Sequence, residues 1–194
     1  MKENPLAKYN TLGLRGPVNP LEREKILTKR VGPESWQEFK QIKLEAIETD
    51  PVSFGHDAQK IAAARELPDE AWQADIERNI VVVTTYDNKP IALARGVQQP
   101  EEGLWTLHAV FVSPKFHKNM TEEGKVAEDT VKKVIIDMKN AGGKKARLWV
   151  RSNLGNAIKL YERLGFKKIN PLLYPKQTIE GWRVMEAGLT NLNN

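Results

Sequence analysis

The stretch "SNLGNAIKLYERLGF", residues 152–166, carries the clearest structural pattern in this 194-residue chain. Its apolar side chains recur at three- and four-residue spacing, which places them on one face of a helix. They are Ala157, Ile158, Tyr161 and Leu164. A glycine commonly ends a helix, and Gly165 follows here, so the pattern predicts a short helix over 155–165 that packs on a core. A tyrosine on such a face is more often a core residue than a catalytic one.

Strands are predicted on both sides of this helix. "KARLWVR" (145–151) precedes it, and "FKKI" (166–169) and "WRVMEAGL" (182–189) follow it. A longer amphipathic helix, with apolar residues spaced over 126–138, comes earlier and ends at the glycine pair 142–143. The C-terminal half therefore predicts a helix, a strand, a second helix and two final strands.

Three apolar runs stand before the long helix. They are "NIVVVTTYD" (79–87), "KPIALARGVQ" (89–98) and "LWTLHAVFV" (104–112). A turn near Asn88 separates the first two closely enough for a hairpin. These runs predict a meander of three strands.

The N-terminal part predicts a strand over 25–31, an amphipathic helix with apolar residues from Trp36 to Ile47, and a weaker helix over 69–77. Residues 1–22 are rich in Pro, Asn and Gly and show no period, which indicates an N-terminal arm. The predicted order is β-α-α-β-β-β-α-β-α-β-β. The chain is thus expected to be one α/β domain, residues 23–194, preceded by that arm.

Composition is ordinary for a soluble globular protein, with 40% hydrophobic and 28% charged residues. A net charge of +5 allows an anionic partner, but the basic residues are spread along the chain, which does not favour nucleic acid. The absence of cysteine excludes disulfides, thiolate metal sites and a cysteine nucleophile. No apolar run reaches membrane-span length and the start has no signal-peptide pattern, so we expect a cytoplasmic protein with no membrane partner.

The loop between the 104–112 strand and the long helix is a candidate anion site. Lys115, His117, Lys118 and Lys125 lie in or near it. A helix N-terminus also carries a partial positive charge and unpaired amide protons, which suit a phosphate. Acidic residues at 122–129 favour a helix N-terminus without any ligand, so both interpretations stay open.

The pattern N-x-x-A-I-x-L-Y-x-x-x-G-F, which "AIKLYERLGF" completes, resembles the signature of the GNAT superfamily of acetyl-CoA-dependent N-acetyltransferases. The preceding "ARLWV" strand and "VSP" (112–114) are similar to that family as well. The resemblance covers roughly residues 25 to 189. It implies a mixed, splayed central sheet of about six to seven strands flanked by about four helices.

The resemblance also implies a site between the strand ending at Val112 and the strand ending near Arg151. Acetyl-CoA would lie there as co-substrate, and no metal is required. Main-chain groups would pair with the pantetheine, and the loop after Pro114 would hold the pyrophosphate. Tyr161 would protonate the departing thiolate. The residues expected to bind the cofactor are Val110, Phe111, Val112, His117, Lys118, Gly124, Lys125, Asn153 and Asn156.

The predicted pyrophosphate loop is degenerate relative to the family pattern Arg/Gln-x-x-Gly-x-Gly/Ala. His117 stands where Arg or Gln is expected, and Val126 stands where Gly or Ala is expected. The segment is also a few residues longer than usual. A valine side chain there would crowd the phosphates, because the glycines let backbone amides approach them.

The base that activates the amine is predicted as His108, whose ordinary pKa suits proton transfer. The alternative is a histidine packed beside Trp105 and Trp149, with Glu101 or Glu102 acting through a water. The expected activity is acetyl transfer to the primary amine of a small molecule or an amino terminus by direct attack in a ternary complex. A catalytically inactive GNAT-like binding or regulatory module is the alternative, and a homodimer is left open.

Overall fold

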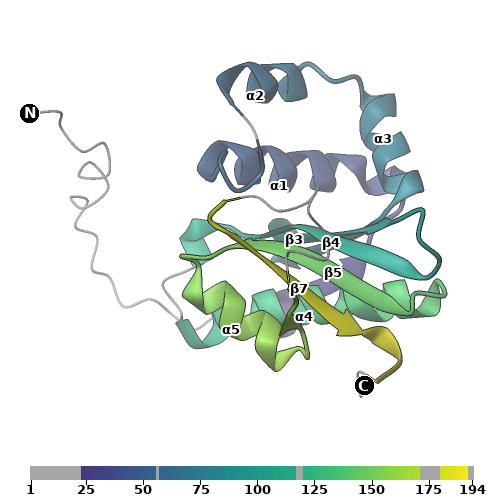
Figure 1. Cartoon of the computed structure of the whole chain (residues 1–194). Coiled ribbons are helices and arrows are strands. Elements are labelled where there is room, and N and C mark those ends of the chain that lie inside the picture. Colours follow the sequence, from purple (N-terminus) through teal and green to yellow (C-terminus); the bar gives the residue numbers. More distant parts are fainter. Residues whose placement is uncertain (1–22, 56, 117–119, 171–179, 192–194) are drawn as a thin grey trace, which may run out of the picture.

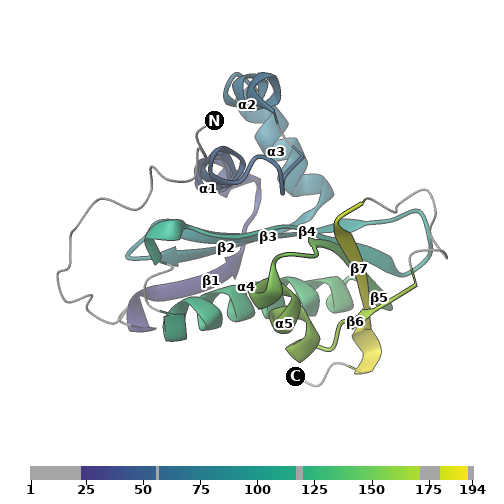
Figure 2. The same cartoon turned by 60° about the vertical axis from the view of Figure 1, so that its left-hand side comes forward.

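The computed structural model describes residues 23–55, 57–116, 120–170 and 180–191, the side chains of 120–124 and 191 excepted. The chain forms a seven-stranded sheet in the order β1-β2-β3-β4-β5-β7-β6. Figure 2 shows α1, α2 and α3 on one face of this sheet and α4 and α5 on the other. Helices therefore flank the mixed α/β sheet, as the family resemblance implies.

The strands are β1 (Ile26–Arg30), β2 (Ile80–Tyr86), β3 (Lys89–Gln98), β4 (Leu104–Val112), β5 (Lys145–Arg151), β6 (Lys167–Lys168) and β7 (Trp182–Gly188). The helices are α1 (Trp36–Thr49), α2 (Ala58–Arg65), α3 (Asp69–Arg78), α4 (Met120–Asn140) and α5 (Gly155–Arg163). Figure 1 shows their arrangement along the chain. Each predicted element is confirmed to within a few residues. Residues 1–22 lie outside the described residues, so the N-terminal arm stays a prediction.

The helix α2 was not predicted, and its sequence explains why. None of its residues is buried, so it has no apolar stripe that packs against the sheet. Asp57 caps its N-terminus by accepting a hydrogen bond from the Lys60 amide at 2.9 Å, a contact of the kind that stabilises helix starts. This helix depends on its cap and on helix-forming alanines rather than on burial.

Two apolar cores lie on opposite faces of the sheet. On one face, Phe39, Ile42 and Ala46 of α1 pack with Trp72 and Ile76 of α3 against β2 and β3. On the other, α4 and α5 cover β2, β3, β4, β5 and β7. Since strand residues alternate between the faces, β3 and β4 supply side chains to both cores.

The central ladder of the sheet stops halfway along β4. β4 and β5 run parallel and pair from Leu104 with Lys145 to Leu107 with Leu148. Beyond that point β4 stays paired with β3, and β5 stays paired with β7. The splayed sheet expected from the family resemblance is therefore present.

An extra residue in β4 lies just past the end of this ladder. Arg95 of β3 pairs with His108, and Leu93 pairs with Phe111. Between these two pairs β3 advances by two residues and β4 by three, so β4 contains one extra residue. Ala109 sits inside this bulge with φ 53°, in the left-handed region. Bulges bend a strand and end its regular pairing, which accounts for the parting of β4 from β5.

Changing Ala109 tests this account of the bulge. The left-handed conformation costs an alanine about 1–2 kcal/mol, and Gly removes this cost but loses about 0.5–1 kcal/mol in chain entropy. We expect Ala109→Gly to unfold in urea with a free energy within about 1 kcal/mol of wild type. Ala109→Val should lose about 2 kcal/mol or more, because a branched residue tolerates positive φ poorly. Equal losses for both variants would contradict the strained backbone at this position.

Candidate active site

The three β4 residues predicted to bind the cofactor lie where β4 and β5 part. Val110 packs against the core under α4 and α5, whereas Phe111 packs into the core under α1. Val112 belongs to a third, smaller apolar cluster near the end of the strand. The predicted residues are thus adjacent on the strand segment past the β4–β5 ladder.

Tyr161 is buried in the core beneath α5. Its ring meets Phe166 edge-on, with the ring centroids 6.0 Å apart. Burial raises the pKa of the Tyr161 hydroxyl, so this group stays protonated at physiological pH. Such a hydroxyl can donate a proton to a developing anion, but it is poorly suited to act as a base.

Asn153 and Asn156 lie just past the end of β5. Asn153 is in the turn after the strand and Asn156 is in the first turn of α5. Both are exposed. Because β4 and β5 are parallel, their carboxyl ends lie at the same side of the sheet, which is where ligands of open α/β sheets usually bind.

The predicted pyrophosphate segment is only partly described. A short 3₁₀ helix covers Pro114–Phe116, and α4 begins at Met120. His117 and Lys118 lie outside the described residues. Gly124 falls inside α4 rather than in a loop, and Lys125 after it is exposed. A helix that begins this early accounts for the extra length of the segment.

The sequence-based expectation that Val126 crowds the phosphates is wrong. Val126 is 2% exposed and packs in a cluster with Ile91, Ala92 and Val112. Its side chain therefore points at the sheet and fills core space. Valine replaces the Gly or Ala of the family pattern here because its side chain fills core space. It therefore does not obstruct the start of α4.

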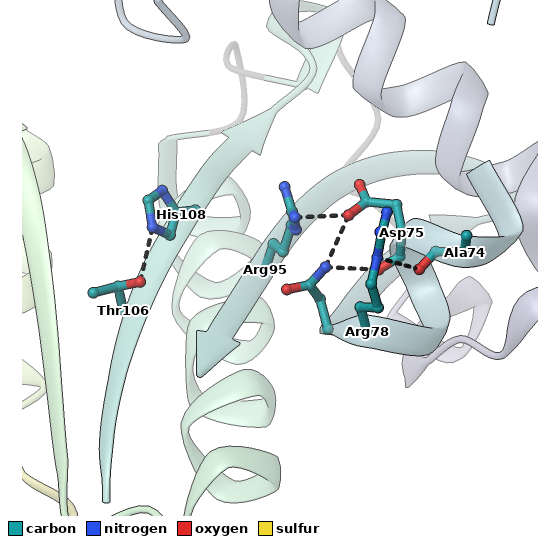
Figure 3. A network of polar contacts seen from close by, with 7 residues as sticks. Ala74, Asp75, Arg78, Arg95, Thr106 and His108 are labelled. Atoms are coloured by element: carbon teal, nitrogen blue, oxygen red, sulfur yellow. Dashed lines mark hydrogen bonds and ion pairs between the residues drawn. The ribbon is translucent and has the colours of Figure 1, made fainter. Parts of the chain in front are cut away.

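His108 lies on the α1 face of the sheet, where neighbouring side chains cover only part of it, so it does not pack in the core with Trp105. Its Nε2 lies 2.8 Å from the Thr106 hydroxyl oxygen (Figure 3). Partial burial among the surrounding side chains, together with the positive charges of Arg95 and Lys43, lowers the pKa of His108 to about 4. The imidazole is consequently neutral across the physiological range, which leaves a nitrogen able to accept a proton but makes it a weak base.

Glu101 and Glu102, the alternative base candidates, are in the turn before β4. The Glu102 carboxylate accepts a hydrogen bond from Lys144 at 2.5 Å. This turn is at the opposite end of β4 from the parting strands. The structure therefore does not bring these two carboxylates together with Val110 or Tyr161.

A charged cluster lies beside His108, and the sequence alone does not predict it. Arg95 Nη2 lies 2.6 Å from the Asp75 carboxylate of α3, and Asn79 donates to the same oxygen at 2.8 Å. Lys43 of α1 is half-buried nearby and affects the pKa of His108. The one signal was Arg95 itself, a charge inside the apolar run "KPIALARGVQ". Figure 3 shows Arg95 between His108 and Asp75.

Two contacts connect the α1 side of the molecule to the ends of the parting strands. Ser113, directly after β4, donates a hydrogen bond to Glu45 of α1 at 2.5 Å. Arg151 at the end of β5 lies 4.0 Å from Asp50, the residue that follows α1. The ends of β4 and β5, which no longer pair with each other, are thus both connected to α1 or to the residue that follows it.

Within the described part of the chain, no group of three or more His, Asp or Glu side chains is arranged to hold a metal ion. No helix in the described ranges is long and apolar enough to cross a membrane.

Comparison with known families and structures agrees with this geometry. A sequence profile described as the acetyltransferase (GNAT) family matches residues 44–166. The chain belongs to the GNAT family. It is therefore an acyltransferase by family, and the match spans the α1 side, the parted strands and α5. A comparison with curated protein sequences gives no match.

Solved structures of the same fold are distant in sequence. A PaiA N-acetyltransferase of Thermoplasma acidophilum in complex with coenzyme A is 16% identical, with a TM-score of 0.61, covering 84% of this GNAT chain and 98% of its own. A GNAT acetyltransferase of Staphylococcus aureus is 13% identical, with a TM-score of 0.62 and coverages of 84% and 99%. One from Streptococcus pneumoniae is 14% identical, with a TM-score of 0.60 and the same coverages. These similarities establish the fold.

The lowered pKa of His108 makes a prediction about stability in acid. The unfolded chain binds a proton at this residue near pH 6.5, whereas the folded chain binds it near pH 4. The folded state therefore loses stability as pH falls from about 6.5 to about 4. In urea denaturation, the stability of His108→Gln relative to wild type should increase over this interval. A difference that stays constant from pH 7.5 to pH 4 would contradict the depressed pKa.

Proposed function

We propose that this GNAT protein transfers the acetyl group of acetyl-CoA to the primary amine of a small molecule or of an amino terminus. The amine attacks the thioester directly while both substrates are bound. The observation that carries the proposal is the parting of β4 from β5 just before the Ala109 bulge, which leaves the last residues of β4 without the β5 ladder. A cytoplasmic location and a homodimer stay predictions.

The donor is proposed to run along the end of β4. Main-chain groups of Val110 to Val112 would pair with the pantetheine, as an added strand pairs with a sheet edge. Beyond them, the start of α4 and the exposed Lys115 and Lys125 would face the phosphates. Asn153 and Asn156 would contact the cofactor from the end of β5, and His117, Lys118 and Gly124 keep their predicted roles. The Thermoplasma neighbour, which is described in complex with coenzyme A, supports a CoA-type donor.

The reaction requires one bond to form and one to break. The amine nitrogen attacks the carbonyl carbon of the thioester, and the carbon–sulfur bond then breaks. The sulfur takes a proton from a donor, for which the protonated and buried Tyr161 is the candidate. The amine loses a proton, for which the neutral His108, directly or through a water, is the candidate. Holding both substrates in place supplies much of the rate increase.

The second candidate function is a GNAT-like module that does not transfer an acetyl group. The observation that favours it is the placement of Gly124 inside α4, since the family loop uses its glycines for close approach to phosphate. Such a module would bind or regulate a partner through the same fold.

Calorimetry with acetyl-CoA distinguishes the two functions. We expect acetyl-CoA and CoA to bind with dissociation constants in the micromolar range, about −8 kcal/mol. Raising the salt concentration should weaken this binding, because part of it comes from cations facing phosphates. No heat of binding at millimolar acetyl-CoA would overturn the transferase proposal in favour of the inactive module.

Tyr161→Phe tests the proposed acid. The variant loses one hydroxyl and keeps the buried ring, so kcat should fall about a hundredfold while the KM for acetyl-CoA stays within about twofold. Tyr86→Phe is the matched control, because it removes a hydroxyl from a ring on β2 that instead contacts Phe116. A Tyr161→Phe enzyme as fast as the Tyr86→Phe control would remove Tyr161 from the mechanism.

A further inference from the structure

Four elements place charged and polar side chains together on the α1 face of the sheet. Lys43 comes from α1, Asp75 from α3, Arg95 from β3 and His108 from β4. Arg95 and His108 are opposite each other in the β3–β4 ladder, and cross-strand partners on one face have neighbouring side chains. Lys43 is close enough to both Arg95 and Asp75 to be affected by their charges. The cluster borders the first β4 residues that lie past the β4–β5 ladder.

Lys43 is a half-buried cation without a close anion. Among the described residues, no carboxylate oxygen lies within 4.0 Å of its Nζ. Its ammonium group lies 4.9 Å from the centre of the Phe54 ring, which attracts a cation but does not neutralise it. Burial, together with a smaller contribution from the charge of Arg95, lowers the pKa of Lys43 to about 8. Folding leaves such a charge only partly compensated, and this destabilises the protein.

Arg95 is also incompletely paired. Asp75 holds one of its terminal nitrogens at 2.6 Å. The Nε of Arg95 is buried and has no hydrogen-bond partner in the described structure. A buried donor that lacks a partner costs about 1–3 kcal/mol. Lys43 and Arg95 together carry two positive charges, and Asp75 carries one negative charge, so the cluster has a net charge of +1. Arg78 also affects Arg95, but its side chain is exposed, so solvent and ions screen its charge.

We propose that Lys43 and Arg95 bind a carboxylate of the acceptor, so that the acceptor of this GNAT protein is an amine that also carries a carboxylate group. This inference rests on the proposed function. One net positive charge matches a monoanionic carboxylate better than a dianionic phosphate. The acceptor anion would supply the close anionic partner that Lys43 lacks. His108, opposite Arg95, then stands beside the bound acceptor.

Steady-state kinetics with matched acceptors tests the proposal. The panel is the free amino acids and a set of dipeptides, each compared with its own C-terminal amide, with acetyl-CoA as donor and aminoalkylphosphonates as the dianionic comparison. We expect the carboxylates to be the better substrates, with a KM about ten- to a hundredfold below that of the amides. Preference for the amides or for the phosphonates would overturn the proposal. In either case measurable acetyl transfer would leave the proposed function standing.

The variant Lys43→Met tests whether the preference for carboxylate acceptors arises from this cluster. The variant should lose most of the preference for the carboxylate over the amide, while the KM for acetyl-CoA stays unchanged. Lys40→Met is the matched control, because Lys40 lies one turn earlier on α1 and has Asp69 at 3.8 Å. It should keep the preference. An equal preference in wild type and in Lys43→Met would contradict a carboxylate site at Lys43.

Two further measurements do not require turnover. In calorimetry, N-acetylated amino acids should bind wild type more tightly than their C-terminal amides do, and Lys43→Met should abolish the difference. Lys43→Met should also melt about 2–5 °C higher than wild type, since it removes a charge that destabilises the folded state. Acids that bind no more tightly than their amides would overturn the inference. A lower melting temperature would contradict the account of Lys43 as an incompletely compensated charge.

Discussion

The parting of β4 from β5 is the constraint on which the rest of this structure depends. β3 holds β4 to its end and β7 holds β5 to its end, so each half of the sheet keeps its pairing where the central ladder stops. The extra residue at Ala109 fixes where this happens, because a bulge turns the strand away from regular pairing. Ser113 and Arg151 then connect the two separated strand ends to Glu45 and Asp50 beside α1. The strand pairing and the bulge thus separate the two strand ends, and contacts with a third element connect both ends to the α1 side.

The two faces of the sheet differ in chemistry at this opening. On the α4 and α5 face the surroundings are apolar, and Tyr161 is buried with a raised pKa. On the α1 face, Lys43, Arg95 and His108 form a polar and mainly cationic surface. A thioester between these faces would have a proton donor on its leaving-group side and charged groups on the side from which an amine approaches. The chemical asymmetry follows from strand alternation, since neighbouring residues of β4 point to opposite faces.

The elements that the sequence predicts well are those with an apolar period. The helix expected over 155–165 is observed as Gly155–Arg163, because its spacing reflects real burial. The helix α2 has no buried residue and gives no such signal. At Val126 the family motif predicted a steric clash, but motif spacing does not show that α4 starts at Met120, or that burial against Ile91 decides where the valine points. The cluster of Lys43, Asp75 and Arg95 joins three distant segments, so only the folded chain brings it into view.

The lack of buried residues in α2 affects how the sequence of this protein can diverge in evolution. This helix joins α1 to α3 without contributing a buried side chain, so insertions, deletions and substitutions there leave both cores intact, and longer surface connections cost little free energy. The neighbouring α1 and α3 supply Lys43 and Asp75, which are themselves outside the apolar core. The proposed acceptor side can therefore diverge while the strands and α5 stay fixed. Related chains should differ most in length and sequence within α2, Ala58–Arg65.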